Sequence, residues 1–209
     1  MPAAGTRGGS RARTRITAGA WRGRLIDTPP GQEVRPTTSL VRQAVFNILG
    51  ERVVDAALLD LFAGAGTISF EALSRGAARA VAVERDRALA TLIESTASRL
   101  GCTDRVRVIP AEVVRWLEQR PRELERAQVC YVDAPYRDDV VLRALELLGG
   151  SPVPLVVCEH HRARALPPAT GRLRAVRTAV YGSTQLTFYA ARPAGADDAP
   201  VGGEEAPTQ

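Results

Sequence analysis

The stretch LLDLFAGAGTISFEALSRGA, residues 58–77, decides the fold of this chain. Its first part, Leu58–Phe62, is a short apolar run, which predicts a strand covered on both faces of a parallel sheet. Ala63–Gly66 is glycine-rich, and glycine lets the chain turn tightly and lets a ligand approach the backbone. Thr67–Arg75 has the apolar spacing of an amphipathic helix. A strand, a glycine loop and a helix in this order are typical of a nucleotide-binding unit.

The helix of this stretch is expected to have one buried and one wet face. Phe70 and Leu73 can face the sheet, while Glu71 and Arg75 are expected to stay in solvent. Gly76 stands where a helix C-terminus commonly needs a left-handed residue. The helix is therefore expected to end just before it.

Two acids indicate which nucleotide this loop binds. The dinucleotide fingerprint has a third glycine where this loop has Ser69, and the Gly-Lys-Ser/Thr of a phosphate-binding loop is missing. Asp60 precedes the glycines, and a carboxylate there suits an ammonium or sulfonium group better than a pyrophosphate. Glu84 ends the next apolar strand, where an acid can accept hydrogen bonds from ribose hydroxyls. This combination resembles the S-adenosylmethionine pocket of Rossmann-like methyltransferases, although the glycine loop alone also fits a dehydrogenase or a structural turn.

Composition indicates a globular intracellular protein. The chain has 209 residues, of which 45% are hydrophobic, enough for one domain with a small appendage. No apolar run reaches the length of a membrane span, and the arginine-rich N-terminus has no apolar signal segment. Cys130 and Cys158 fall in apolar strands and Cys102 makes the count odd, so reduced thiols are expected rather than disulfides or metal ligands. We expect a reducing cytoplasm, no metal and no membrane.

Charge favours a polyanionic partner. The net charge is +5 and every basic residue is arginine, which suits phosphate binding and stacking on bases. Residues 1–50 hold eight arginines against two acids, residues 160–177 hold five arginines and no acid, and residues 194–209 hold four acids and no base. A GC-rich genome would produce the same preference for arginine.

The order of predicted elements indicates a mostly parallel sheet. A hairpin over Arg15–Asp27 and a helix over Thr38–Leu49 precede the glycine loop. Strands and helices then alternate, and a hairpin turns at Tyr181–Ser183. This alternation predicts an α/β fold whose parallel sheet contains one antiparallel strand. The remaining strands are expected at Arg105–Ile109, Ala127–Val132, Pro154–Cys158, Leu173–Val180 and Gln185–Ala190, and the remaining helices at Asp86–Leu100, Glu112–Gln119 and Val140–Leu148.

Four parts are expected along the chain. Residues 1–13 should be a disordered basic tail, and residues 14–52 an N-terminal extension. Residues 53–192 should form the catalytic domain, and residues 193–209 a disordered acidic tail.

A second group of candidate catalytic residues follows the fourth strand. Asp133-Ala134-Pro135-Tyr136 stands at its carboxyl end, and the carboxyl ends of strands in an open α/β sheet form the binding crevice. Three other acids, Asp60, Glu84 and Glu112, stand at such ends as well. Glu112 could equally serve as a helix cap.

These motifs resemble one family closely. Asp133–Tyr136 looks like the (Asp/Asn)-Pro-Pro-(Tyr/Phe) motif of methyltransferases that act on exocyclic amines. RPTTSLVRQAVFNIL, DLFAGAGTISFEALSRGA and VYGSTQL together look like the bacterial 16S rRNA guanine-N2 methyltransferases called RsmD. The resemblance covers Arg15–Arg192. It implies a Rossmann-like class I fold, a seven-stranded sheet in the order 3-2-1-4-5-7-6, S-adenosyl-L-methionine as cofactor, and an N-terminal extension that contacts RNA.

The resemblance also implies roles for single residues. Asp133, Ala134, Pro135 and Tyr136 are expected to hold the target base. The cofactor is expected to be bound by Asp60, Phe62, Ala63, Gly64, Gly66, Glu84 and Glu112. RNA contacts are expected from Trp21, Arg22, Arg24, Arg35, Thr37 and Arg42, although Trp21 could instead fill the core of its hairpin. Alanine at position 134, where the family has proline, removes a constraint on φ but keeps the backbone carbonyl as an acceptor.

We therefore expect a cytoplasmic, monomeric enzyme that methylates N2 of a guanine in 16S rRNA of the small ribosomal subunit. Methylation of another exocyclic amine, such as adenine N6 of RNA or DNA, is an enzymatic alternative that the Asp133 motif leaves open. An RNA-binding assembly factor with vestigial catalysis is the alternative from another class.

Overall fold

A computed structural model of the chain describes residues 12–28, 36–135 and 139–192, with the backbone alone for residues 36–38. The expectations for Arg35, Tyr136, residues 1–11 and residues 193–209, and for the side chain of Thr37, lie outside the described residues. No helix in the described ranges is long and apolar enough to cross a membrane.

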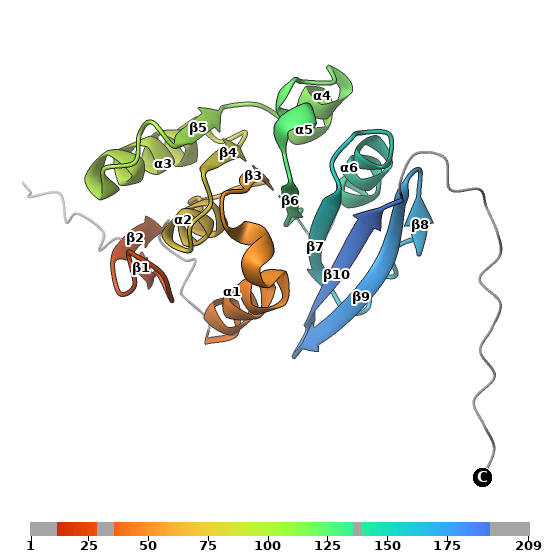
Figure 1. Ribbon diagram of the computed structural model, residues 1–209, viewed down its shortest axis with the longest axis horizontal. Helices are drawn as coiled ribbons and strands as arrows, with labels where there is room; N and C mark the ends of the chain where they lie inside the picture. Colours follow the sequence, from red (N-terminus) through yellow and green to blue (C-terminus); the bar gives the residue numbers. More distant parts are fainter. Residues whose placement is uncertain (1–11, 29–35, 136–138, 193–209) are drawn as a thin grey trace, which may run out of the picture.

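One eight-stranded sheet forms the centre of the molecule (Figure 1). Its strand order is β5-β4-β3-β6-β7-β10-β9-β8, and the first five strands of this order run parallel. Without the two-residue edge strand β8 this is the predicted order 3-2-1-4-5-7-6. The strands are β3 (Ala57–Leu61), β4 (Arg79–Val83), β5 (Val106–Ile109), β6 (Val129–Val132), β7 (Leu155–His161), β8 (Ala169–Thr170), β9 (Leu173–Tyr181) and β10 (Thr184–Ala191).

The sequence underestimated the antiparallel part of this sheet. β10 is antiparallel to both β7 and β9, and β8 is antiparallel to β9, so two strands rather than one oppose the parallel set. β7 also continues to His161, three residues beyond its expected end, because β10 pairs with it as far as that residue. The predicted α/β fold class is nevertheless confirmed.

Helices cover both faces of the sheet, which gives three layers (Figure 1). Side chains of α1, α2 and α3 pack with Leu58 and Tyr131 in one core, and those of α4, α5 and α6 pack with Leu59 and Val132 in the other. All residues of β3 and β6 are buried, and for β3 this confirms the strand covered on both faces that its apolar run predicted. The helices are α1 (Pro36–Leu49), α2 (Thr67–Ser74), α3 (Arg87–Leu100), α4 (Val113–Glu118), α5 (Glu123–Arg126) and α6 (Val140–Gly149), with a 3-10 turn η1 (Gly50–Val53) after α1.

The N-terminal hairpin packs against α2. Its strands β1 (Ala12–Arg15) and β2 (Leu25–Thr28) are antiparallel, as expected. In the turn between them, the N–H of Ala20 donates to the carbonyl of Ser74 at 2.7 Å. Gly19 has a φ of 82°, and a Cβ there would lie 1.9 Å from the carbonyl oxygen of Ser74, so only glycine permits this approach.

Glu71 is a correction to the sequence prediction, because it is fully buried rather than in solvent. The hairpin covers the face of α2 that was expected to be wet. The Glu71 carboxylate accepts hydrogen bonds from the backbone N–H groups of Thr17 and Ala18, at 2.9 and 3.1 Å. It also forms ion pairs with Arg42 and Arg75, at 3.3 and 3.0 Å. A pattern read along one helix could not reveal a second partner that comes from another segment of the chain.

Candidate active site

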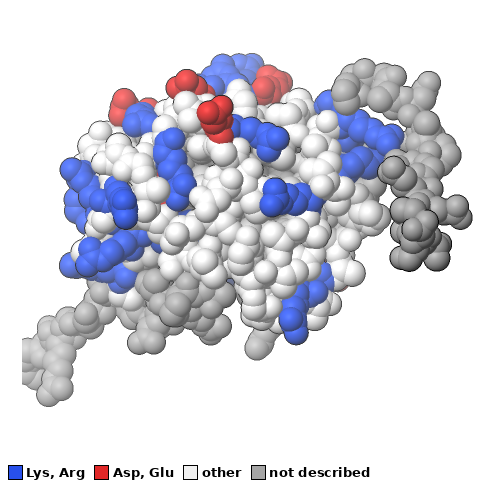
Figure 2. Space-filling view, turned by 60° about the horizontal axis from the view of Figure 1, so that its bottom comes forward, with Lys and Arg blue, Asp and Glu red and all other residues white. Residues whose placement is uncertain are grey.

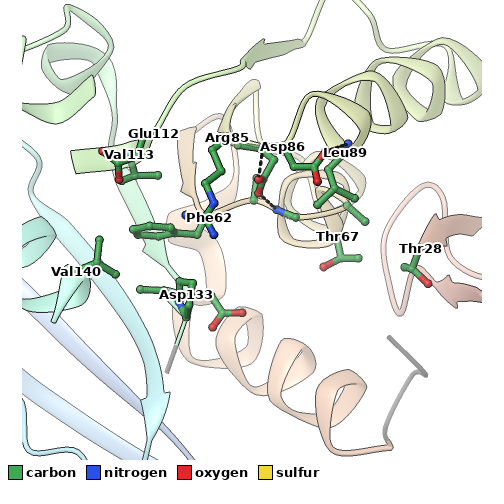
Figure 3. A pocket seen from close by; sticks show the side chains of 16 residues that line it. Thr28, Phe62, Thr67, Arg85, Asp86, Leu89, Glu112, Val113, Asp133 and Val140 are labelled. Atoms are coloured by element: carbon green, nitrogen blue, oxygen red, sulfur yellow. Dashed lines mark hydrogen bonds between the residues drawn. The ribbon is translucent and has the colours of Figure 1, made fainter. Parts of the chain in front are cut away.

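A cavity of about 550 Å³ opens at the carboxyl ends of β3, β4 and β6. Its size lies in the range of small-molecule sites. Figure 3 shows that Asp133, Phe62 and Val140 lie on one side of it and that Thr67, Leu89 and Thr28 lie on the other. Eight of the residues predicted for the site line this cavity: Phe62, Ala63, Gly64, Glu84, Glu112, Asp133, Ala134 and Pro135.

The glycine loop has an unusual backbone. Phe62, Gly64 and Gly66 all have positive φ, at 62°, 56° and 72°. A Cβ on Gly64 would meet nothing within 4 Å, whereas one on Gly66 would lie 3.1 Å from Ile93 and 3.2 Å from Phe70. Gly64 therefore keeps the loop backbone open to the cavity, and Gly66 lets the loop pack on α2 and α3. A non-glycine residue such as Phe62 in this region costs about 1–3 kcal/mol, and such strain clusters at functional sites.

Glu84 links the glycine loop to the loop that follows β4 by two hydrogen bonds. Its Oε2 accepts a hydrogen bond from the N–H of Gly64 at 2.8 Å, and its Oε1 accepts one from the N–H of Asp86 at 2.8 Å. Each carboxylate oxygen has a second lone pair, so Glu84 can also accept from a ligand hydroxyl. The residue predicted to bind ribose thus also shapes the glycine loop.

Asp60 lies behind the glycine loop and is not one of the residues that line the cavity. Its Oδ2 accepts hydrogen bonds from the N–H and the hydroxyl of Ser69, at 3.1 and 2.7 Å. Burial raises the pKa of Asp60 to about 7, against the opposing effect of these hydrogen bonds. In this structure Asp60 holds the first turn of α2, so direct contact with the cofactor stays a prediction.

Glu112 satisfies both alternatives that the sequence left open. It lines the cavity, and it is also the N-cap of α4, where its carboxylate accepts from the N–H groups of Val114 and Arg115 at 3.1 and 2.9 Å.

Asp133 stands on the opposite wall of the cavity, at the end of β6. Asp133 is an exposed residue that lines the cavity. Loss of hydration raises the pKa of Asp133 well above its ordinary value, and the nearby carboxylates of Glu159 and Asp60 raise it further. Ala134 is buried, so this position has packing neighbours even without the proline ring of the family motif.

Several residues of the cavity wall were missed by the sequence analysis. Thr28 is the most instructive, because it comes from the hairpin, and its buried hydroxyl has no hydrogen-bond partner among the described residues. No sequence signal places a hairpin beside the glycine loop. Asp86, in contrast, could have been found as the N-cap of α3, where it accepts from the N–H groups of Ala88 and Leu89. The other missed residues are Ala65, Thr67, Arg85, Leu89, Val113 and Val140.

The described residues predicted to contact RNA lie outside this cavity. Arg22 and Arg24 are exposed in the hairpin turn. Trp21 is half-buried, packs against the core, and lies 5.7 Å from the guanidinium of Arg105, which supports its alternative as a hairpin plug. Arg42 differs from the prediction, because it is buried and its Nη2 donates to the carbonyl of Arg15 at 2.8 Å.

Basic side chains nevertheless dominate one face of the molecule. Figure 2 shows arginines spread from the side of the β1–β2 hairpin to that of β9, while acidic side chains appear only along the upper edge of this view. Such a face attracts a polyanion.

The cavity fits S-adenosylmethionine. The acids Glu84, Asp86 and Glu112 offer acceptors for hydroxyl and amino groups, and Phe62, Leu89 and Val113 offer apolar surface. The open backbone at Gly64 allows close approach. Among the described residues, no group of three or more His, Cys, Asp or Glu side chains is placed to hold a metal ion.

A mostly parallel sheet in this strand order, with a glycine loop and strand-end acids around one cavity, defines a class I methyltransferase of the Rossmann-like type. The family model described as Conserved hypothetical protein 95 matches residues 14–190, and the chain belongs to this family. This confirms the resemblance to RsmD that the sequence motifs carried.

Known proteins support this assignment. The chain is 32% identical to "Ribosomal RNA small subunit methyltransferase D" of Escherichia coli (strain K12), over 88% of this chain and 93% of that protein. It is 30% identical to "Putative rRNA methyltransferase YlbH" of Bacillus subtilis (strain 168), over 85% of this chain and 99% of the relative. The solved structure "Putative methyltransferase yhhF from Escherichia coli" superposes with a TM-score of 0.73 at 31% identity, and covers 86% of this chain and 98% of its own.

Proposed function

We propose that this protein transfers the methyl group of S-adenosylmethionine to the exocyclic N2 of a guanine in 16S rRNA of the small ribosomal subunit. The observation that carries this proposal is the cavity itself. The glycine loop, Glu84 and the segment Asp133-Ala134-Pro135 line the same cavity, and Asp133 lies across it from Thr67 at the start of α2 (Figure 3). A cofactor held by the glycine loop and Glu84 would therefore have its reactive group near a base held at Asp133. The names of the relatives support rRNA of the small subunit as the substrate.

The cofactor supplies a methyl group on a sulfonium centre, which is electrophilic enough for direct displacement. Glu84 would hold it by accepting from the ribose hydroxyls, and the open backbone of the loop at Gly64 would allow close approach. Glu112 and Val113 would lie beside the adenine. Phe62, in its strained backbone conformation, supplies an apolar surface on the side of the cavity where Asp133 lies.

Asp133 and the backbone of Ala134 act on the target amine. The guanine amino lone pair is delocalised into the ring, so the amine is a weak nucleophile and positioning matters first. Two acceptors aimed at its N–H groups hold the nitrogen and stabilise the positive charge that develops on it. The proton that leaves N2 after methyl transfer can pass to the carboxylate of Asp133 or to water. Tyr136, outside the described residues, would supply a face for stacking of the base, which is worth about 1–3 kcal/mol.

The N-terminal extension, residues 14–52, contacts the RNA in this proposal, and residues 53–192 carry out the reaction. Arg22 and Arg24 are its exposed cations. We place the enzyme in the cytoplasm, where the ribosomal subunit is assembled, and expect it to act as a monomer.

Comparison of rRNA from cells with and without the gene tests this function. Purified protein and S-adenosylmethionine should restore one N2-methylguanine to small subunits from the deletion strain, and mass spectrometry should locate it. Restoration of a methyl group on adenine N6 would favour the other exocyclic amine. Cofactor binding with no methylation of any rRNA would favour an assembly factor.

A further inference from the structure

Glu159, a residue outside the cavity wall described above, stands beside Asp133 at the end of the next strand. β6 and β7 are parallel, and their last register pair is Val132 with Cys158. The following residues, Asp133 and Glu159, therefore occupy equivalent positions, and side chains at such positions point to the same face of a sheet. β7 continues beyond this point while β6 ends, so a regular strand holds Glu159 next to Asp133.

A hydrogen bond from a residue of the neighbouring strand β6 orients the carboxylate of Glu159. The hydroxyl of Tyr131, a buried residue two positions before Asp133, donates to its Oε2. Its Oε1 has no hydrogen-bond partner among the residues that the structure describes. Glu159 is partly exposed, so this second oxygen is available to a group that arrives from the side of Asp133.

The two carboxylates also interact electrostatically. Burial raises the pKa of Glu159, against the opposing effect of the Tyr131 hydroxyl, and the charge of Glu159 contributes to the raised pKa of Asp133. Such mutual influence is expected of acids on neighbouring strand ends.

The strand order places Asp133 and Glu159 relative to the cofactor site. The glycine loop follows β3 and Glu84 follows β4, Asp133 follows β6, and Glu159 stands on β7. Glu159 is thus on the far side of Asp133 from the cofactor wall. If the amine of a base lies at Asp133 and points toward the cofactor, the adjoining edge of the base lies beside Glu159.

We propose that Glu159 accepts the N1–H of the target guanine while Asp133 accepts from its N2 amine, so that the two carboxylates together select guanine. This inference rests on the proposed function. Guanine presents two adjacent donors, N1–H and N2–H, which match two adjacent acceptors. Adenine has an acceptor at N1, which would face a carboxylate with no proton between them. A site whose buried polar groups stay unpaired rejects the wrong ligand strongly.

The base analogue 2-aminopurine separates the two interactions, because it keeps the N2 amine but has an acceptor at N1. Small subunits are reconstituted from 16S rRNA that carries either guanine or 2-aminopurine at the mapped target nucleotide, introduced by ligation. We expect the wild-type enzyme to methylate the guanine subunits at least about tenfold faster. Glu159→Gln offers an amide N–H that can donate to N1 of 2-aminopurine, so the preference should fall at least about tenfold. Cofactor affinity should stay unchanged.

Two further variants make the result specific. Glu146→Gln is the same substitution at an exposed position of α6 and should keep the wild-type preference. Tyr131→Phe keeps the Glu159 carboxylate but removes the hydroxyl that orients it, so it should lower the preference for guanine without changing cofactor affinity. An unchanged ratio of the two rates in both Glu159→Gln and Tyr131→Phe overturns the inference. If the wild-type enzyme methylates neither subunit, the proposed function itself is wrong.

Discussion

Arg42 of α1 and Glu71 of α2 form a buried ion pair, with 3.3 Å between Nε and Oε2. The Nη2 of Arg42 also donates to the hydroxyl of Thr14 at 3.2 Å, so the pair joins both helices to the hairpin. Thr28, at the end of this hairpin, lines the candidate active site. The N-terminal extension is therefore part of the structure that shapes the cavity, in addition to its proposed contact with RNA.

Removal of Glu71 should destabilise the protein strongly. Glu71→Ala leaves the guanidinium of Arg42 buried without its carboxylate and leaves the N–H groups of Thr17 and Ala18 without their acceptor. Breaking a buried pair in this way costs about 3–5 kcal/mol. Urea unfolding measures the change, and Glu94→Ala on the exposed side of α3 is the matched control. Equal unfolding midpoints for the two variants would show that the pair does not anchor the hairpin.

Glu84→Gln should weaken the binding of S-adenosylmethionine. Gly64 and Asp86 each donate a backbone N–H to one oxygen of Glu84, and an amide offers only one oxygen. One N–H then faces an NH₂ group, the glycine loop is held less firmly, and the ribose no longer meets a charged acceptor. Loss of a hydrogen bond to a charged group costs about 1.5–3 kcal/mol. Titration calorimetry should show the weaker affinity, while the rate at saturating cofactor changes less. Wild-type affinity would remove Glu84 from the cofactor site.

Asp60 should make stability depend on pH. Its pKa is about 7 in the folded protein, above the ordinary value of 3.8. Between these values the folded state holds a proton that the unfolded state lacks, so the stability from this group is lost as pH rises from about 4 to 7, by a few kcal/mol.

Asp60→Asn removes this titration but keeps an oxygen for the N–H of Ser69. The free energy of unfolding should therefore decrease less in the variant than in the wild type between about pH 4.5 and 7.5, a range that covers most of this window. Asp133 and Glu159 also have raised pKa values and continue to contribute in the same direction. The same slope in both proteins would mean that Asp60 is ionised throughout.

The exposed arginines of the hairpin turn should contribute to RNA affinity. Arg22→Gln with Arg24→Gln removes two cations, and each phosphate that is no longer neutralised should reduce the slope of log affinity against log salt by roughly 0.7–0.9. Arg115→Gln with Arg122→Gln removes two cations from the opposite helical layer and is the control. Filter binding to deletion-strain small subunits at several salt concentrations measures both slopes. Equal slopes for the hairpin variant and the control variant would show that the hairpin arginines only solvate the surface.

Local patterns predicted the parts of the site that lie within one segment. The glycine loop, Glu84 and Asp133 each follow an apolar strand, and the parallel arrangement of those strands brings their ends to one edge. Glu71, Arg42 and Thr28 could not be placed in this way. Their environment depends on where the hairpin packs, which is an interaction between segments more than 25 residues apart.

The apolar spacing also gave a wrong prediction for α2. One face of this helix was expected in solvent, but the helix is covered on both sides. Residues Ile68–Ser74 are all buried, although the sequence of α2 contains Glu71 and two serines. Those polar groups are satisfied by specific partners: Ser69 donates to Asp60, and Ser74 donates to the carbonyl of Ala18 at 2.6 Å. Polar residues that are buried with partners look the same in a sequence as polar residues in water.

Asp133 should matter for methyl transfer more than for binding of the cofactor. Asp133→Ala removes the carboxylate that accepts from the target amine and leaves the carbonyl of Ala134 as the remaining acceptor. Loss of one preorganised electrostatic partner typically costs about 10²–10³ in rate. Asp133→Asn keeps an oxygen without the charge and should retain more activity than the alanine variant.

The pH dependence gives Asp133 a signature that a structural role would not produce. Its pKa is raised, so the acceptor form is lost as pH falls through that raised value, and the single-turnover rate of the wild type should fall with it. Asp133→Asn cannot be protonated there, and its rate should lack this acidic limb, apart from any contribution of Glu159. Single-turnover methylation of deletion-strain small subunits, with cofactor affinity measured in parallel, provides the comparison. Wild-type rates in Asp133→Ala would exclude a catalytic role, whereas activity lost together with cofactor binding and cooperative unfolding would make Asp133 a structural residue at the end of β6.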